Sequence, residues 1–284
     1  MAKPVGVFFT EKFKGFDWPI IGERFAGFPE AFGGLLKDRR VIFYEPKPVD
    51  ESLLRQVHSE HLLRSVSRAW YYEGARLAVG GCVEALEKIW LGEVGSALVF
   101  NVAAGHHAGP DAAWGGTYLS CFGPAVKNLR AKYGVSRFAI IDTDSHHADG
   151  DREMFRGDQD ILHVCFCSYN SVEEGGLKVD VNVGWQTTDE KYLELVEAEF
   201  ASRVRKFKPA AILHSFGYDT CQGDYGDRGL TVNFYPRLAY KVKKLADEVC
   251  EGRYLIVVMG GASAETANLI LPEIVKVLLG DLTF

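Results

Sequence analysis

The sequence lacks the features typical of exported, membrane-spanning and nucleic-acid-binding proteins. No uncharged apolar run approaches the ~18 residues needed to span a bilayer, and the apolar stretch 4–9 is too short for a secretory signal. The six cysteines form no Cys-x-x-Cys pair, so we expect reduced, mainly structural thiols. Lys and Arg number 32 against 38 Asp and Glu, without a basic block. We therefore expect a cytoplasmic protein without membrane or nucleic-acid partners.

Short strand-like and longer helix-like segments alternate along all 284 residues, of which 47% are hydrophobic. Eight β-branched or aromatic runs are predicted as strands: residues 5–10, 40–44, 97–102, 138–142, 161–167, 178–183, 210–215 and 254–259. Helical patterns cover residues 66–90, 111–133, 189–207, 234–250 and 264–279. This alternation predicts an α/β fold of three layers, with a mostly parallel sheet between helices. Since no linker or repeat interrupts it, we expect one domain spanning residues 1–284.

Polar residues gather where four of the predicted strands end. These segments are residues 101–107, 142–149, 217–219 and 260–261, and the first three carry His or Asp. Ligands of parallel α/β sheets bind beyond the carboxyl ends of the strands. We therefore expect these segments to form one site.

Asp144 and His146 alternate along one segment, so their side chains share a face and together suit a metal ion. Asp219, after a neighbouring strand, is the expected third ligand. Zn²⁺ takes such nitrogen and carboxylate donors, and a catalytic site keeps one position open for water. Fe²⁺ could occupy the same donor set. The alternative is a strand-end turn in which these side chains bind only backbone groups.

The tandem pair His106-His107 offers the proton transfer that metal-assisted hydrolysis requires. Two neighbouring imidazoles, each oriented by a carboxylate, can divide the work between accepting a proton and stabilising charge. Asp142 and Asp149 are the candidate orienting carboxylates. The alternative is a pair of loop histidines whose hydrogen bonds serve the fold alone.

The order of these motifs resembles the histone deacetylase superfamily. The similarity rests on Gly105-His106-His107-Ala108, Asp111, Gly115, Tyr118, the run 141–150, Gly217-Tyr218-Asp219, Gly229-Leu230-Thr231, the segment 55–59 and Asn182-Val183, and it extends from about residue 6 to 280. The resemblance implies a zinc-dependent deacetylase or amidohydrolase acting on acetyl-lysine, an acetyl-polyamine or a related small amide. It also implies the arginase/deacetylase fold, with an eight-stranded sheet.

Site roles follow from the resemblance position by position. The implied zinc ligands are Asp144, His146 and Asp219; the catalytic residues are His107 as general base, His106 beside it, and Asp142 and Asp149 as their carboxylate partners. A structural monovalent cation, K⁺, is implied near Asp142. Gly115, Gly116 and Gly261 are the candidate substrate-binding positions.

Two departures from the family pattern concern the substrate pocket. Where the family carries Gly-Gly-Tyr after the last strand, this sequence has Ala262, and Ser263 is too short to replace a phenol. Tyr218 or Tyr225 could supply one from another direction. A tunnel aromatic is also expected just after Gly115, where Gly116 stands. Trp114 and Tyr169 are candidates to compensate for it.

Three functions therefore stay open. The first is a working zinc hydrolase, and the second is a catalytically weak or silent relative that binds an acylated ligand or a partner. The third, a two-metal ureohydrolase, is disfavoured because Ala148 and Cys221 stand where further oxygen ligands are needed. A homo-oligomer is compatible with each function.

The remaining histidines and cysteines are expected to be structural. His58 and His61 lie in a helical context, and His163 and His214 lie within predicted strands. Cys165 and Cys167 have the spacing of one strand face, for which packing is the favoured interpretation.

Overall fold

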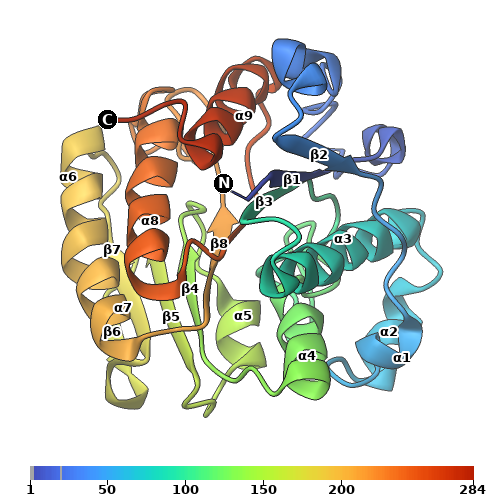
Figure 1. The fold of residues 1–284 in the computed structure, drawn as a ribbon. Coiled ribbons are helices and arrows are strands. Elements are labelled where there is room, and N and C mark those ends of the chain that lie inside the picture. The colour runs from blue at the N-terminus through green and yellow to red at the C-terminus, as the bar shows by residue number, and fades with distance from the viewer. Residues whose placement is uncertain (1–2, 20) are drawn as a thin grey trace.

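A computed structural model describes residues 3–19 and 21–284 (Figure 1). Within that part of the chain, one sheet has the strand order β2-β1-β3-β9-β8-β4-β5-β7-β6. Its strands are β1 Val5–Phe8, β2 Val41–Tyr44, β3 Ser96–Val99, β4 Phe138–Asp142, β5 Ile161–Cys167, β6 Ser171–Glu173, β7 Lys178–Asn182, β8 Ala211–Phe216 and β9 Tyr254–Val258. All pairs are parallel except β6 with β7, which is antiparallel.

The predicted α/β fold is confirmed, but the predicted count of eight strands is wrong. All eight predicted strands are present with ends shifted by at most three residues, and β6 is the ninth among the described residues. It has three residues at the edge of the sheet, and its Val172 is 67% exposed. Because β6 buries no apolar run, the hydrophobic pattern gave no signal for it.

Helices cover both faces of the sheet (Figure 1). They are α1 Glu51–Leu54, α2 Glu60–Val66, α3 Tyr72–Leu91, α4 Phe122–Tyr133, α5 Asp149–Met154, α6 Asp189–Leu195, α7 Ser202–Phe207, α8 Phe234–Cys250 and α9 Ala264–Leu279, with 3-10 segments at Glu11–Gly15, Glu30–Lys37 and Glu174–Gly176. Helices α3, α4 and α5 lie on one side, and α6 to α9 on the other. Phe166 of β5 contacts Tyr192 of α6, which places α6 against the face of β5 opposite its cysteines.

Two helix predictions were partly wrong. The helix expected over 111–133 begins only at Phe122, because residues before it form a loop in which Gly115 and Gly116 have φ of +60° and +77°. The helix expected over 66–90 begins only at Tyr72 as α3, because residues 67–71 form turns after the end of α2 at Val66. The helices predicted over 234–250 and 264–279 are confirmed. The helix predicted over 189–207 is also confirmed, with a π-helical turn at Val196–Ala201 between α6 and α7.

Strand order brings the polar segments together. β3, β9, β8 and β4 are neighbours in the sheet, and all point the same way. The chain segments after these four strands therefore meet at one edge, as the sequence predicted.

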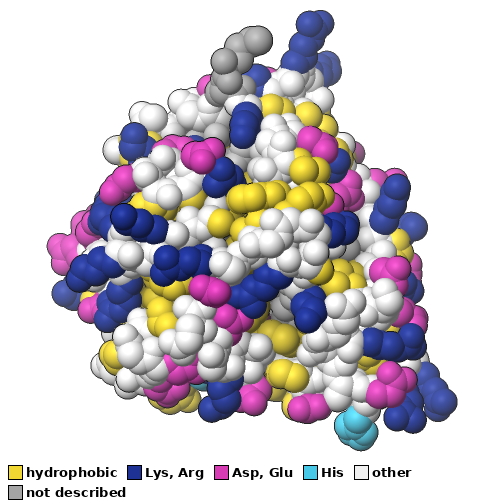
Figure 2. Space-filling model, turned by 60° about the horizontal axis from the view of Figure 1, so that its bottom comes forward, with side chains coloured by type: hydrophobic (Ala, Val, Ile, Leu, Met, Phe, Trp, Pro, Cys, Tyr) yellow, Lys and Arg dark blue, Asp and Glu magenta, His cyan; other side chains and the backbone are white. Residues whose placement is uncertain are grey.

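Surface charge is mixed on the face shown in Figure 2, where basic and acidic side chains lie intermingled. Among the described residues, no helix combines the length and apolar character that crossing a membrane demands.

Candidate active site

Asp144, His146 and Asp219 meet beyond the ends of β4 and β8. The Asp142 carboxylate accepts the Asp144 backbone N–H, and the Asp144 carboxylate accepts that of His146, both at 3.0 Å. These successive turns fold the segment back over the strand end. Asp144 Oδ1 and Asp219 Oδ2 then lie 2.8 and 3.2 Å from His146 Nδ1.

The three side chains fit a metal ion. Their donor atoms all lie within 4.8 Å of one another. A tetrahedral Zn²⁺ site with bonds of about 2.0–2.2 Å separates N and O donors by about 3.4 Å, close to the distances found. Asp144 and Asp219 are buried side by side, and hydrogen bonds to these carboxylates raise the pKa of His146 to about 11. The two buried anions thus demand a cation, and a divalent ion would meet that demand.

Each histidine of the pair 106–107 is bonded to its own carboxylate. His106 Nδ1 lies 2.8 Å from Asp142 Oδ2, and His107 Nδ1 lies 2.5 Å from Asp149 Oδ1. Burial disfavours the charged form of His106, but the Asp142 and Asp144 carboxylates outweigh it and raise its pKa to about 10. Burial and the neighbouring His106 lower the pKa of His107, partly offset by Asp149. Their surroundings therefore shift the pKa values of the two imidazoles in opposite directions.

A cavity of about 230 Å³ contains these groups. Its lining includes His106, His107, Asp144, His146, Trp18, Trp114, Gly115, Gly116, Tyr225 and Gly260. The Trp114 ring lies 4.1 Å from that of His107, and its Nε1–H donates to Asp149 at 2.7 Å. A Cβ on Gly115 would stand 2.7 Å from the His107 ring, so only glycine allows this approach.

Gly116 stands where an aromatic residue was expected. A Cβ built on Gly116 would lie 3.2 Å from the side chain of Trp18. Trp18 and Trp114 thus form the aromatic walls of the cavity. Tyr169, the other proposed substitute, is not among its lining residues and instead contacts the His147 ring at 5.4 Å.

The turn after β9 carries Ala262 where the family has a tyrosine, and it contacts Tyr225 from the segment after β8. The Asp224 carboxylate accepts the backbone N–H groups of Ala262 and Ser263 at 3.0 and 3.1 Å. The Tyr225 hydroxyl accepts the Gly261 N–H at 3.0 Å, and its ring lies 5.8 Å from that of His146. Gly260, not Gly261, lines the cavity.

Tyr218, the other candidate phenol, lies behind this turn. It is fully buried, and a Cβ on Gly261 would stand 2.4 Å from its ring. Its hydroxyl is not part of the cavity lining. Of the two tyrosines, only Tyr225 reaches the site.

Sequence reasoning missed two residues of the N-terminal segment, Trp18 and Arg24. Buried Arg24 donates to the Asn101 carbonyl at 2.6 Å and to the Met259 carbonyl, which ties the segments after β3 and β9 together. Its charge is paired with Asp17 at 2.7 Å. Neither residue belongs to a periodic pattern or motif, so neither gave a signal.

The histidines expected to be structural have such roles where they are buried. His58 Nδ1 bonds the Gly109 carbonyl at 2.9 Å, and its Nε2 accepts the Ser120 N–H at 3.0 Å. His214 lies between Thr143 and Tyr254. His163 accepts from the Arg152 guanidinium at 3.3 Å, and His61 is exposed.

Comparison with known proteins relates this architecture to a family. Residues 69–278 match the model of the histone deacetylase domain. The chain is 29% identical to histone deacetylase HDA1 of Saccharomyces cerevisiae over 74% of its own length and 32% of the relative. It is 27% identical to a probable deacetylase of Archaeoglobus fulgidus over 82% of the chain and 73% of that protein.

Another relative is the histone deacetylase-like amidohydrolase of Pseudomonas aeruginosa, with 27% identity over 77% of the chain and 65% of that protein. The solved HD domain of HDA15 has the same fold, with a TM-score of 0.84 and 21% identity over the whole chain and 91% of that domain. The chain spans about a third of the length of the yeast relative. On the extent of the domain match, the chain belongs to the histone deacetylase domain family.

Proposed function

We propose that this protein is a zinc-dependent amide hydrolase of the deacetylase type, which converts an acylated amine and water into a carboxylic acid and the free amine. The observation that carries the proposal is the convergence of one Asp/His/Asp donor set and two His–Asp pairs on a single cavity. A protein that only binds acylated ligands has no need for two imidazoles that are each bonded to a carboxylate beside a metal-binding donor set. The substrate class is acetyl-lysine, an acetyl-polyamine or a related small amide.

A divalent zinc ion held by Asp144, His146 and Asp219 would supply polarisation of the scissile carbonyl and a lowered pKa for water. His107, neutral near pH 7, takes the proton of the attacking water. Asp149 and Trp114 hold its ring through the bonds described above. His106, kept cationic by Asp142, stabilises the developing negative charge, and either histidine returns a proton to the departing amine.

Tyr225 supplies the phenol in this proposal. In the family pattern, that phenol belongs to a tyrosine after the last strand. Burial, together with the Asp219 and Asp144 carboxylates, raises the pKa of Tyr225, so the hydroxyl keeps its proton. The hydrogen bond from Gly261 uses a lone pair of the oxygen and leaves that proton for an acceptor in the cavity. Asp224 fixes Tyr225 against the turn that carries Ala262.

Other predictions about this protein stay predictions. They concern K⁺ near Asp142, Fe²⁺ in place of zinc, the cytoplasmic location, a homo-oligomeric state and the single-domain organisation. Cys165 stands beside Asp142 in the register of β4 and β5, and a thiol is a poor ligand for a hard cation such as K⁺.

The test is turnover by the zinc-loaded chain with a panel of acetyl-lysine peptide, trifluoroacetyl-lysine peptide and an acetylated polyamine. We expect hydrolysis of at least one, with release of equal amounts of acid and amine. If the chain binds zinc and cleaves none of them, the proposal is wrong. The result would then support the alternative function, a catalytically silent relative that binds an acylated ligand or a partner. Ala262 is the observation that favours this alternative, because the family tyrosine is missing there.

A further inference from the structure

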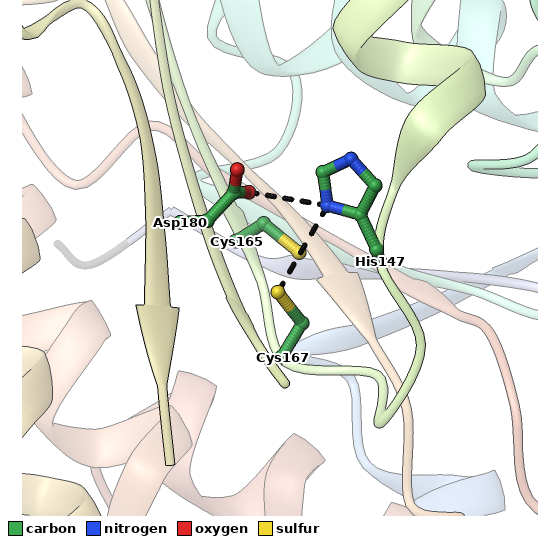
Figure 3. A group of neighbouring side chains, drawn as sticks. All are labelled: His147, Cys165, Cys167 and Asp180. Atoms are coloured by element: carbon green, nitrogen blue, oxygen red, sulfur yellow. Dashed lines mark hydrogen bonds and ion pairs between the residues drawn. The ribbon is translucent and has the colours of Figure 1, made fainter. Parts of the chain in front are cut away.

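A second group of metal-binding side chains lies next to the proposed active site. We call His147, Cys165, Cys167 and Asp180 the thiol cluster (Figure 3). Cys165 and Cys167 alternate on β5 and so share one face, and Cys165 is paired with Asp180 of β7 in the sheet register. His147 approaches from the segment after β4, and Figure 3 shows one of its ring nitrogens pointing toward the other members.

The spacing within the thiol cluster suits a tetrahedral ion. His147 Nδ1 lies 3.2 Å from Asp180 Oδ1 and 3.9 Å from Cys167 Sγ, and all four donor atoms lie within 4.8 Å of one another. Bonds of about 2.3 Å to sulfur and about 2.0–2.2 Å to N and O separate tetrahedral S and N donors by about 3.6 Å, and N and O donors by about 3.4 Å. One proton on His147 Nδ1 cannot serve both partners in straight hydrogen bonds, whereas a single ion would contact all four donors.

Neighbouring groups hold Asp180 in place and balance the charge. Buried Arg152 of α5 donates to both Asp180 oxygens at 2.7 and 3.1 Å, and the Ser171 hydroxyl donates at 2.6 Å. Two thiolates, one carboxylate and a neutral imidazole around a divalent cation carry a net charge of −1. The Arg152 guanidinium offsets that charge. Such support of a ligating carboxylate is a regular feature of metal sites.

An ion can reach the thiol cluster from the surface. His147 lines a groove of about 590 Å³, together with Ser168, Tyr169 and Trp185. Its side chain is 26% exposed, whereas Cys165, Cys167 and Asp180 are buried behind it. The site would therefore have one accessible ligand over an enclosed set of donors.

We propose that His147, Cys165, Cys167 and Asp180 form a second, sulfur-containing metal site that binds Zn²⁺ or another thiophilic divalent cation. Two thiolates with imidazole and carboxylate donors favour Zn²⁺ over Mg²⁺ or Ca²⁺. All four positions are taken by protein groups, so the site is structural in type. It would tie β5 and β7 to the segment that carries His146. The sequence alone favoured a packing role for both cysteines, and the proposal replaces that interpretation.

Cobalt substitution tests this site separately from the active site. The full chain is stripped of metal under reducing conditions and titrated with Co²⁺, while the near-ultraviolet thiolate-to-cobalt charge-transfer absorption is followed. Because Asp144, His146 and Asp219 contain no sulfur, this absorption distinguishes the thiol cluster from the proposed active site. We expect it in the wild type, together with a second equivalent of bound Co²⁺.

Cys167→Ser removes one of the two thiolates, so we expect the charge-transfer absorption to fall by at least half and the second equivalent to bind much more weakly. Cys250→Ser is the matched control, because Cys250 is also buried but lies on α8, and both signals should persist there. A wild type that lacks the absorption overturns the proposal, whatever the variants do. So does an absorption that keeps its full intensity in Cys167→Ser.

Discussion

Two adjacent histidines, His146 and His147, belong to two donor groups of different chemistry. His146 faces two carboxylates beside the cavity, and His147 faces two thiols and one carboxylate between the sheet and α5. His146 lies at the end of the bend formed by residues 144–146, and His147 follows it, so the two neighbouring side chains enter separate sites. The oxygen-rich group suits an ion that must hold water, while the sulfur-rich group suits an ion held permanently. Their proximity in sequence therefore does not imply a shared function.

Asp219→Asn should produce the largest difference between the proposed active site and the thiol cluster. It removes one anionic donor from the active site, so zinc affinity there should fall by more than ~10²-fold, beyond the loss typical of a supporting partner, and turnover at stoichiometric zinc should disappear. The thiolate-to-cobalt absorption should remain. Metal analysis, an activity assay and the Co²⁺ spectrum measure the three quantities. Loss of the absorption together with the activity would mean that the two groups form one unit.

His107→Ala should lower kcat by about 10²–10⁴-fold, the usual contribution of a general base, while both metals stay bound. Because burial and His106 lower the pKa of His107 below its ordinary value of 6.5, the wild-type rate should fall only as the pH drops below that value and protonates the base. The variant should lose this acid limb. A pH profile of kcat/KM from the two proteins, each loaded with zinc, makes the comparison. An unchanged acid limb in His107→Ala would assign the base elsewhere.

Tyr225→Phe should lower kcat by about 10²–10³-fold, as the loss of one oxyanion donor does. Tyr218→Phe is the matched control and should leave kcat unchanged, because the Tyr218 hydroxyl lies outside the cavity lining. Adding Ala262→Tyr to the Tyr225→Phe protein should restore part of the rate by returning a phenol to the turn after β9. Equal rates for Tyr225→Phe and wild type would remove Tyr225 from the proposed mechanism.

The motif-bearing residues of the candidate site could be predicted to lie together, because Asp144, His146, Asp219 and both His–Asp pairs lie at or just after the ends of predicted strands. Their convergence then needed only the rule that parallel strands end at one edge. Trp18 could not be predicted, since its place against Gly116 depends on the path of an irregular N-terminal segment. The thiol cluster could be predicted only in part. The spacing of Cys165 and Cys167 was visible, but Asp180 joined them only through the register of β5 with β7.

Arg152→Lys should produce a smaller effect, confined to the thiol cluster. Lysine keeps the positive charge but loses the paired hydrogen bonds that hold Asp180. The affinity of the cluster for Co²⁺ should fall by about 10–100-fold, as is typical when a group supporting a ligand is replaced. Competition with a chelator, followed by the charge-transfer absorption, measures this affinity. Arg156→Lys is the control, because exposed Arg156 bonds only Glu153 among the side chains described, and no change is expected. An affinity that is equal in wild type and Arg152→Lys would mean that Asp180 is held without the guanidinium, or that it is not a ligand. Asp180→Asn would then decide between these two outcomes, because it removes the carboxylate donor itself and should weaken Co²⁺ binding only if Asp180 is a ligand.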